Sequence, residues 1–284
     1  MKKVVFIGNR INVFDVLWLN QNELEITKVF VLRNSLLHKN MDNYQIDYEL
    51  FDICKNDKFK LFEFLKTTEF DLLISNGCPF VIPINELNKD TSKVLFINTH
   101  PSYLPHLKGK TPLNAVFMMD YNFIGATTHF MDDGIDSGNI IYQEKIEITT
   151  DIDQGLVYFI SFKLENIVFK KALEVLKNSN YIFEGKPQEG GGTYFNRKDE
   201  EFIIDFSLDT SEIIIKKINS LGMTNLYNLV NIEGKDYKVH NCDLIINSFL
   251  NEQYLKEDVG KIICMYSDKM LVKTLDGIVK LSYI

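Results

Sequence analysis

The stretch Val94-Leu95-Phe96-Ile97-Asn98-Thr99-His100-Pro101-Ser102 joins a short apolar run to polar groups that follow it directly. Four apolar residues in succession predict a buried strand, and α/β proteins place their ligand sites beyond the carboxyl ends of such strands. Asn98 and His100 are therefore expected just past the end of a strand, beside a crevice. Side chains two positions apart point to the same side of an extended backbone, so both could contact one substrate atom.

A second group of polar residues lies further along the chain, where His129 is followed by Asp132-Asp133-Gly134-Ile135-Asp136-Ser137-Gly138. Together the two stretches supply an amide, an imidazole and a carboxylate. The residue types alone leave other interpretations open, because Asn98 could cap a turn and the aspartates could form an ordinary acidic turn or a calcium loop. The Asp-x-Asp-x-Asp-Gly order of an EF-hand is absent, however.

A metal-dependent hydrolase is a further alternative. His106 and His129 could join His100 and Asp136 as metal ligands. No His-x-x-x-His or Cys-x-x-Cys spacing supports such a site, so we expect no metal in the chemistry.

The first half of the chain alternates strand and helix patterns. Apolar runs predict strands at residues 4–7, 29–32, 72–75 and 94–97. Helical periodicity predicts helices at residues 13–19 and 59–65. This alternation is typical of an α/β fold with a Rossmann-like, doubly wound and mostly parallel sheet.

A strand at residues 139–148 and a long amphipathic helix at residues 151–177 follow. Asp151 or Asp153 is the expected N-cap of this helix. Its apolar stripe is predicted to face the core and consists of Leu156, Phe159, Ile160, Leu164, Ile167, Val168 and Val175.

The strongest break in the chain is the glycine-rich run at residues 185–192. After it come a helix near residues 211–221 and short strand patterns at residues 228–232, 238–239, 260–263, 270–274 and 278–282. The sequence thus predicts a catalytic domain at residues 1–184, and a linker with a small β-rich C-terminal domain at residues 185–284.

Composition limits the class of partner. The 284 residues include 31 basic and 39 acidic side chains, which gives a net charge of -8. This balance is the opposite of a nucleic-acid footprint, so we expect no nucleic acid partner, although an acidic balance also serves simply to keep a protein soluble.

The cysteines and the apolar runs indicate a cytoplasmic protein. Cys54, Cys78, Cys242 and Cys264 are scattered without paired spacing, and no secretory leader precedes the first strand. No apolar run approaches the roughly 20 residues that span a bilayer, so no membrane insertion is expected.

Several separated motifs match one known family in order and spacing. They are Ile97-Asn98-Thr99-His100-Pro101-Ser102-Tyr103-Leu104-Pro105, Gly109, Pro112, Gly125-Ala126-Thr127-Thr128-His129 and Asp133-Gly134-Ile135-Asp136-Ser137-Gly138. In these motifs the chain resembles the formyltransferases that use 10-formyltetrahydrofolate, which include methionyl-tRNA formyltransferase, glycinamide ribonucleotide transformylase and the sugar N-formyltransferases.

The resemblance implies roles for particular residues. The family's catalytic trio falls on Asn98, His100 and Asp136, with His129 as a neighbouring hydrogen-bonding residue. The pocket for the folate pterin would be lined by the loop after the strand at residues 72–75, together with Asp133. The residues of that loop are Gly77, Cys78, Pro79, Phe80, Val81 and Ile82.

The chemistry of formyl transfer explains the three residue types. Transfer to an amine passes through a tetrahedral centre whose oxygen gains negative charge, and the amide of Asn98 could donate a hydrogen bond to it. The attacking amine must lose a proton and the leaving folate nitrogen must gain one, for which the imidazole of His100 is suited near pH 7. Asp136 could stabilise the protonated imidazole and relay the proton through water.

Basic residues near the same crevice are candidates for binding the acceptor. Gly8-Asn9-Arg10 follows the first strand but lacks the G-x-G-x-x-G of a dinucleotide loop, so no nicotinamide cofactor is expected. Arg10, Lys108 and Lys110 could contact a phosphate or carboxylate of the acceptor. Solvated basic side chains are an equally good interpretation of all three.

The region around the linker extends the resemblance. Residues 193–206 resemble the segment that joins the two domains of formyltransferases acting on nucleotide-linked amino sugars. The sequence therefore predicts formyl transfer from 10-formyltetrahydrofolate to the amine of a dTDP- or UDP-linked amino-dideoxyhexose, for surface polysaccharide such as lipopolysaccharide or O-antigen, by a possible homodimer. The alternatives are a methionyl-tRNA formyltransferase and, from another class, a non-catalytic nucleotide-sugar binding protein. A glycinamide ribonucleotide transformylase fits less well, because the resemblance implies that such an enzyme is a shorter, single-domain protein.

Overall fold

The computed structural model describes residues 1–223 and 225–284, which form two compact units. The first unit comprises Met1–Lys110, Ile124–Ile146 and Ile160–Phe195, and the second comprises Thr111–Phe123, Glu147–Phe159 and Asn196–Ile284. The second unit includes two segments that precede residue 184, Thr111–Phe123 and Glu147–Phe159, so the units are not divided at one point of the chain. The domain boundary expected from the glycine-rich run stays a prediction.

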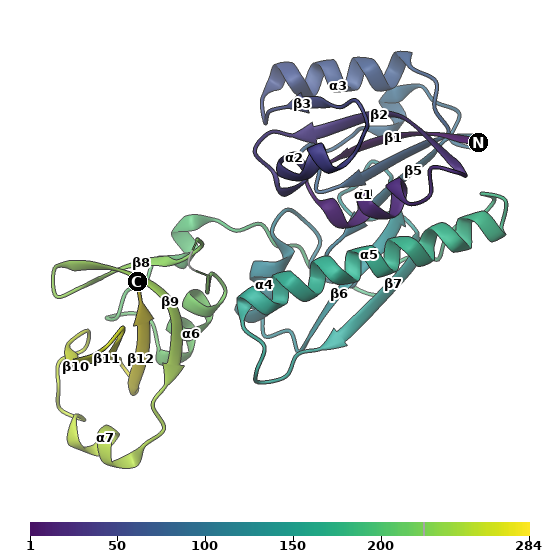
Figure 1. The fold of residues 1–284 in the computed structure, drawn as a ribbon. Coiled ribbons are helices and arrows are strands. Elements are labelled where there is room, and N and C mark those ends of the chain that lie inside the picture. Colours follow the sequence, from purple (N-terminus) through teal and green to yellow (C-terminus); the bar gives the residue numbers. More distant parts are fainter. Residues whose placement is uncertain (224) are drawn as a thin grey trace. The chain divides into compact units, whose positions relative to one another are not determined.

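A mixed sheet with the strand order β3-β2-β1-β4-β5-β6-β7 is the central feature of the first half of the chain (Figure 1). Its strands are β1 (Lys2–Gly8), β2 (Leu24–Leu32), β3 (Glu49–Phe51), β4 (Leu72–Asn76), β5 (Leu95–His100), β6 (Phe123–Phe130) and β7 (Ile140–Glu147). The helices of this half are α1 (Ile11–Trp18), α2 (Leu36–Asn40), α3 (Lys55–Thr67), α4 (Pro112–Met118) and α5 (Gln154–Asn178), with short 3-10 turns at Met41–Asn43 and Ile84–Leu87.

The direction of the strands confirms the doubly wound prediction. β3, β2, β1, β4 and β5 pair in parallel, whereas β6 runs antiparallel to β5. The strand order reverses between β1 and β4, where Gly8 pairs with Asn76 at the carboxyl ends of both strands. In open α/β sheets this switch point is where ligands bind.

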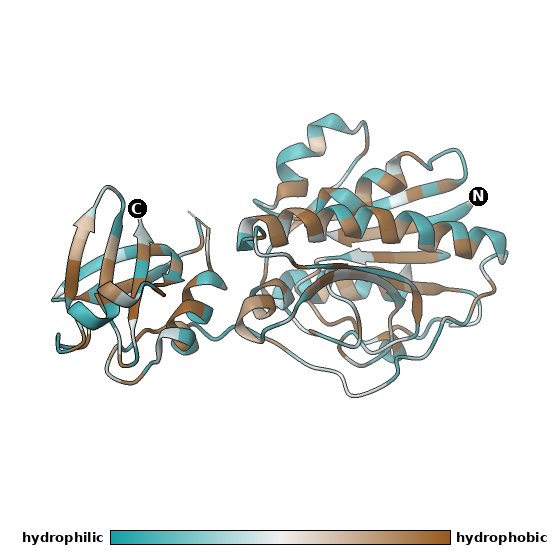
Figure 2. Cartoon of the chain, turned by 90° about the horizontal axis from the view of Figure 1, so that it is seen from below, coloured by the Kyte–Doolittle hydropathy of each residue, from teal (hydrophilic) through white to brown (hydrophobic). Residues whose placement is uncertain are grey.

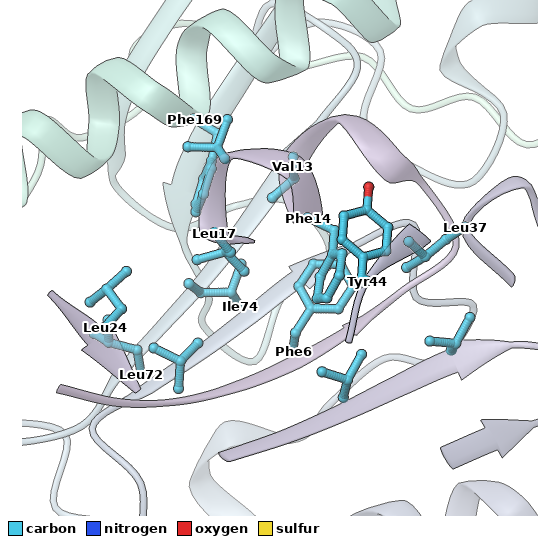
Figure 3. Close-up of a cluster of buried hydrophobic side chains, with 14 of the residues drawn as sticks. Phe6, Val13, Phe14, Leu17, Leu24, Leu37, Tyr44, Leu72, Ile74 and Phe169 are labelled. Atoms are coloured by element: carbon cyan, nitrogen blue, oxygen red, sulfur yellow. The ribbon is translucent and has the colours of Figure 1, made fainter. Parts of the chain in front are cut away.

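Two apolar clusters cover the two faces of the sheet because strand side chains alternate. On one face Val4 and Phe6 of β1 pack with Phe14 of α1 and Phe169 of α5. The close-up in Figure 3 shows Phe6, Phe14 and Phe169 in this cluster. On the other face Val5 and Ile7 of β1 pack with Leu73, Phe96 and side chains of α3. Every position from Val4 to Ile7 is fully buried, which explains the uninterrupted apolar run of a central parallel strand.

Helix α5 carries both hydrophobic and hydrophilic residues along its length (Figure 2), and its buried side differs from the predicted stripe. Asp153 caps the helix as expected, accepting a hydrogen bond from the Leu156 amide at 2.8 Å. Leu156, Phe159 and Ile167, however, are exposed, so the prediction that these three face the core was wrong. The buried side includes the polar residues Gln154, Ser161 and Glu165, and a search for apolar periodicity alone could not find it.

The end of the chain forms the β-rich region that the sequence predicts. Its sheet has the order β10-β11-β12-β9-β8, with antiparallel pairing. The elements are a 3-10 turn (Asp199–Phe202), α6 (Ser211–Asn219), β8 (Asn228–Ile232), β9 (Lys235–Leu244), α7 (Ser248–Gln253), β10 (Ile262–Tyr266), β11 (Lys269–Lys273) and β12 (Ile278–Tyr283). Ile214 and Ile218 of α6 pack against one face of this sheet and close its apolar core.

Two general expectations concern membranes and thiols. None of the helices in the described residues has the length together with the apolar character that crossing a lipid bilayer demands. The four cysteines are unpaired: Cys54 and Cys264 are exposed, Cys78 is partly covered and Cys242 is buried.

Candidate functional site

The pairing of β5 with β6 brings the two polar motifs together. The antiparallel register sets Asn98 directly opposite His129 and His100 opposite Thr127. β5 ends at His100, so Asn98 and His100 are among the last three residues of the strand. The sequence pattern instead predicts them just past the end of the strand. Asn98 Nδ2 lies 3.2 Å from His129 Nε2, which joins the amide of one motif to an imidazole of the other.

Asp136 lies at the centre of this group. One carboxylate oxygen, Oδ1, lies 3.4 Å from Asn98 Nδ2 and 3.6 Å from His129 Nε2, and the other, Oδ2, lies 3.5 Å from His100 Nδ1. The Gly109 amide donates to Oδ2 at 3.0 Å. The structure thus brings Asn98, His100 and Asp136 together, in a compact group that also contains His129.

The backbone of Asp136 is held in an uncommon conformation. Its φ is 50°, in the left-handed region that aspartate tolerates better than most residues. Gln188 Nε2 donates to the carbonyls of Asp136 and Gly138 at 2.9 and 2.8 Å, and so fixes the turn that aims the carboxylate. Gln188 was not among the predicted site residues, because its sequence signal was only a position beside the glycine-rich run.

Backbone carbonyls decide which nitrogen of each histidine carries a proton. His100 Nε2 lies 2.9 Å from the Leu107 carbonyl, and since a carbonyl only accepts, Nε2 is the donor. In the neutral ring Nδ1 is then a free acceptor that faces Asp136. His129 Nδ1 donates to the Phe130 carbonyl at 2.7 Å in the same way, so its Nε2 accepts from the Asn98 amide.

Burial and neighbouring charges shift the pKa values of both His100 and Asp136. Burial lowers the pKa of His100 below its ordinary value of 6.5, and it outweighs the opposing effect of the Asp136 carboxylate. Burial alone would raise the pKa of Asp136, but His100, His129 and the Gly109 amide hold it well below its usual range. At neutral pH the site therefore holds a neutral imidazole beside an ionised carboxylate, which is the state needed to accept a proton.

The predicted folate loop lies at the carboxyl end of β4. Gly77 has a φ of 72°, and a side chain there would collide with Asn9. Burial raises the pKa of the Cys78 thiol to about 12, so this thiol is neutral near pH 7. Of the remaining positions Ile82 is buried, Pro79 and Phe80 are half-buried and Val81 is exposed.

A polar contact joins this loop to the aspartate turn. Asp133 accepts a hydrogen bond from the Asn85 amide at 3.1 Å and another from the Asn85 side chain. Asn85 lies in the 3-10 turn that follows the loop. Asp133 therefore borders the loop that the sequence assigns to the pterin, although no hydrogen bond in the described residues joins it to Asn98, His100 or Asp136.

The three basic residues predicted to contact the acceptor have different surroundings. Arg10 forms an ion pair with the buried Glu165 and lies over the Phe162 ring, 4.9 Å from its centroid. Lys108 is largely covered, with its ammonium over the Tyr194 ring, whereas Lys110 is exposed. Their role toward the acceptor stays a prediction.

A metal site requires several ligating side chains that converge on one point. In residues 1–223 and 225–284, no group of three or more histidine, cysteine, aspartate or glutamate side chains is arranged to hold a metal ion. The imidazoles of His100 and His129 each use one nitrogen for a backbone carbonyl. The absence of a metal from the chemistry stays a prediction.

Comparison with known proteins identifies the family. Residues 19–173 match the family described as formyl transferase, which is more than half of the chain. The methionyl-tRNA formyltransferase of Caldicellulosiruptor saccharolyticus is 30% identical over 234 residues, covering 80% of this chain and 69% of that protein. The methionyl-tRNA formyltransferase of Ehrlichia ruminantium is 30% identical over 157 residues, and the match spans 55% of this chain and only 50% of that relative.

Solved structures with the same fold include sugar formyltransferases. WlaRD, a sugar 3N-formyl transferase crystallised in the presence of dTDP and 5-N-formyl-THF, has a TM-score of 0.69 at 22% identity, and the match covers 100% of this chain and 98% of that one. The N-formyltransferase from Helicobacter canadensis, in complex with folinic acid and dTDP-3-aminofucose, has a TM-score of 0.66 at 20% identity and matches over the whole of both chains. The motifs, the arrangement of the site and the family match lead to one conclusion: the chain belongs to the formyl transferase family.

Proposed function

We propose that the chain transfers a formyl group from 10-formyltetrahydrofolate to the amine of a dTDP- or UDP-linked amino-dideoxyhexose. The observation that carries the proposal is the convergence of Asn98, His100 and Asp136 at the carboxyl end of β5 in a chain of this family. A nucleotide-sugar binding protein without activity would have no need for an ionised carboxylate between an amide and a neutral imidazole.

His100 is the base in this proposal. The folate donor supplies the formyl group, and the chain must remove the proton that the amine releases on attack. The Nδ1 atom of His100 is the unprotonated nitrogen, because Nε2 donates to the Leu107 carbonyl. A proton taken up at Nδ1 is stabilised by Asp136 Oδ2, 3.5 Å away, and is returned from there to the leaving nitrogen.

Asn98 is the donor to the oxygen that gains negative charge. Its amide nitrogen is turned into the site by His129 Nε2, which can only accept in this tautomer. The contact from Asn98 Nδ2 to Asp136 Oδ1 is long, at 3.4 Å, so this hydrogen is the one available to the reacting oxygen. A preoriented donor of this kind lowers the barrier because it needs no rearrangement during the reaction.

The loop at residues 77–82 and Asp133 are proposed to hold the folate. The hydrogen bonds between Asn85 and Asp133 support this assignment, because they join the loop to the turn that carries Asp136. A ligand bound against both segments would present its formyl group to the trio. The complexes of WlaRD and the Helicobacter canadensis enzyme with formylated or reduced folates also support a folate donor.

An amino sugar linked to a nucleotide is the proposed acceptor. The two sugar formyltransferase structures match this chain from end to end and were determined with dTDP or dTDP-3-aminofucose. A net charge of -8 also opposes the many phosphate contacts that a tRNA requires. We further propose that the product serves surface polysaccharide synthesis in the cytoplasm and that Arg10, Lys108 and Lys110 are the candidates for acceptor contacts.

A methionyl-tRNA formyltransferase is the second candidate, because the curated relatives with about 30% identity carry that name. One assay separates the two. The purified chain is incubated with 10-formyltetrahydrofolate and either a panel of dTDP- and UDP-linked amino sugars or methionyl-tRNA, and formylated product is measured by mass spectrometry. We expect product with at least one nucleotide sugar and none with the tRNA. Efficient formylation of the tRNA with an inert sugar panel would overturn the acceptor assignment and leave the formyl transfer chemistry intact.

A further inference from the structure

Glu165 is a buried carboxylate that the proposed chemistry does not use. It lies in α5 with an exposed fraction of 0%, and its Oε1 forms the ion pair with Arg10. Asn76 Nδ2 donates to the same oxygen at 3.0 Å and to the Thr99 carbonyl at 3.0 Å. Helix α5 is thereby tied through polar contacts to the ends of β4 and β5.

The group lies at the switch point of the sheet. Asn76 is the last residue of β4 and pairs with Gly8, the last residue of β1. Arg10 follows β1 after a single intervening residue and immediately precedes α1. Since open α/β sheets bind ligands at this place, a cation fixed here is suitably positioned to meet a substrate.

Stability is a weak explanation for the pair. A buried ion pair often contributes no more than well-packed apolar residues would, because both charges lose their hydration. Glu165 Oε2 and Asn76 Oδ1 have no hydrogen-bond partner in the part of the chain that the structure describes, which adds to the cost of burying them. Burial also raises the pKa of Glu165, against the opposing effect of the Arg10 charge.

Arg10 retains hydrogen-bond donors that its contacts in the described residues do not use. Its contacts in the described residues are Nη1 with Glu165 and the guanidinium plane with Phe162. The side chain is 19% exposed, and Nε and Nη2 have no hydrogen bond among those residues. A guanidinium held from one side by a carboxylate and an aromatic ring is a preorganised fork for a phosphate.

The two faces of the sheet indicate which substrate this fork meets. Phe96 of β5 belongs to the apolar cluster that also receives Ile82 and Phe80 of the predicted folate loop, and Asn98 points to the same face as Phe96. Ile97 packs on α5 instead, so Thr99 and the Glu165 group lie on the opposite face. An anion bound by Arg10 therefore approaches the sheet on the face covered by α5, opposite the face on which the predicted folate loop packs.

We propose that Glu165 is a positioning residue that holds Arg10 against the diphosphate of the nucleotide-linked acceptor. The inference rests on the proposed function and assigns the part of the acceptor that Arg10 recognises. Glu165 touches no substrate and acts only through the guanidinium. Removal of Glu165 should therefore weaken binding of the acceptor but leave the chemistry at His100 and the folate unchanged.

The test is a double-mutant cycle with R10M, E165Q and R10M/E165Q. The assays are run at pH 8, because the Arg10 charge helps to lower the pKa of His100 and the imidazole must stay neutral in its absence. Each variant should raise KM for the nucleotide sugar by about 10-fold or more, as expected for a lost charge-assisted contact, with kcat and the KM for 10-formyltetrahydrofolate within about twofold of the parent. The double variant should be no worse than R10M, because Glu165 acts through Arg10. Calorimetry with dTDP alone should show the same loss of affinity, and kcat/KM for the free amino sugar without its nucleotide should not change.

Lys177→Gln is the matched control. It breaks the ion pair between Lys177 and Glu23, which is 2.7 Å long and lies at the C-terminal end of the same helix. This variant should leave every KM unchanged. If E165Q alone fails to fold, R10M/E165Q leaves no buried charge and supplies the acceptor KM in its place. A parent-like acceptor KM in R10M and the double variant, or penalties for R10M and E165Q that simply add, would overturn the inference alone. A parent that is inert with every nucleotide sugar would overturn the proposed function and this inference with it.

Discussion

Asp136 has contacts with every other member of the proposed site. Its two carboxylate oxygens have different partners. Oδ1 faces Asn98 and His129, and Oδ2 faces His100 and accepts a hydrogen bond from the Gly109 amide. The charges that His100 and His129 carry when they are protonated, together with the Gly109 amide, hold its pKa well below the usual range despite burial. A permanently ionised carboxylate is suited to stabilise an imidazolium that exists only during the reaction.

Replacing His100 by asparagine should depress formyl transfer by about 100-fold or more, since acid-base help of that size is lost. His100 lies in a site whose strand pairing does not depend on the ring, so the melting temperature should stay close to that of the parent. The check is turnover of purified protein beside His106→Asn, on the neighbouring loop, which should remain within about twofold. Near-parent turnover of H100N would remove His100 from the mechanism.

Asn98→Ala should lower kcat by about 100-fold while leaving KM for both substrates almost unchanged, because the proposed hydrogen bond strengthens only as the oxygen becomes charged. Steady-state kinetics with each substrate varied in turn separates the two constants. A rise in KM with an unchanged kcat would mean that Asn98 binds the ground state and is not the proposed donor.

The pH profile follows from the lowered pKa of His100. The neutral form is active, so kcat/KM should be level near pH 7 and fall only below the ordinary histidine value of 6.5. The Asp136 charge raises the pKa of His100, so Asp136→Asn should lower it further and move this acid limb to lower pH, on a reduced overall rate. Measurement of kcat/KM from pH 4.5 to 8 for both proteins tests the sign, and a limb that moves to higher pH contradicts the assignment.

At the scale of elements, the site depends on one antiparallel strand in a mostly parallel sheet. β6 turns back along β5 and places His129 opposite Asn98. The turn after β6 then carries Asp136, and the segment beyond α5 returns to it through Gln188. The site is therefore assembled from β5, the loop that follows it, β6 with its turn, and the linker.

Gln188→Ala should lower kcat by about 10-fold, because two hydrogen bonds that fix the Asp136 turn are lost and the carboxylate is less well aimed. The fold should persist, since the contact is peripheral to both apolar clusters of the sheet. Kinetics together with thermal melting provide the measurement, and the exposed neighbour Glu189→Ala is the control. A kcat equal to that of the control would show that the turn holds its shape without Gln188.

At the scale of the whole molecule, the chain carries more negative than positive charge, and the proposed chemistry uses an amide, an imidazole and a carboxylate. These groups can stabilise the charged oxygen and move the proton without a Lewis acid. Formyl transfer should therefore persist after exhaustive chelation and should not rise when zinc, manganese or magnesium is restored. The measurement is activity beside metal content by mass spectrometry, and loss on chelation with recovery at one metal per chain would favour a metal-dependent mechanism.

The sequence by itself determined the local features of this protein. Periodicity over a few residues predicted β1, β4, β5, α1 and α3, and the alternation within β5 placed Asn98 and His100 on one side, because these properties depend only on near neighbours in the chain. The resemblance in the motifs then indicated the family before any contact was known. Strands β3 and β6, which carry no strong apolar signal of their own, were not predicted.

Only the tertiary structure decided which distant groups meet. The contacts of Asp136 with Asn98 and His100, the hold of Gln188 on the turn and the ion pair of Glu165 with Arg10 join residues far apart in sequence. Their proximity depends on strand order, on the reversal of β6 and on the rotation of α5, and none of these is encoded in a local pattern. The buried side of α5 illustrates the reason: it includes Ser161 and Glu165, whose burial becomes favourable only when partners from other strands surround them.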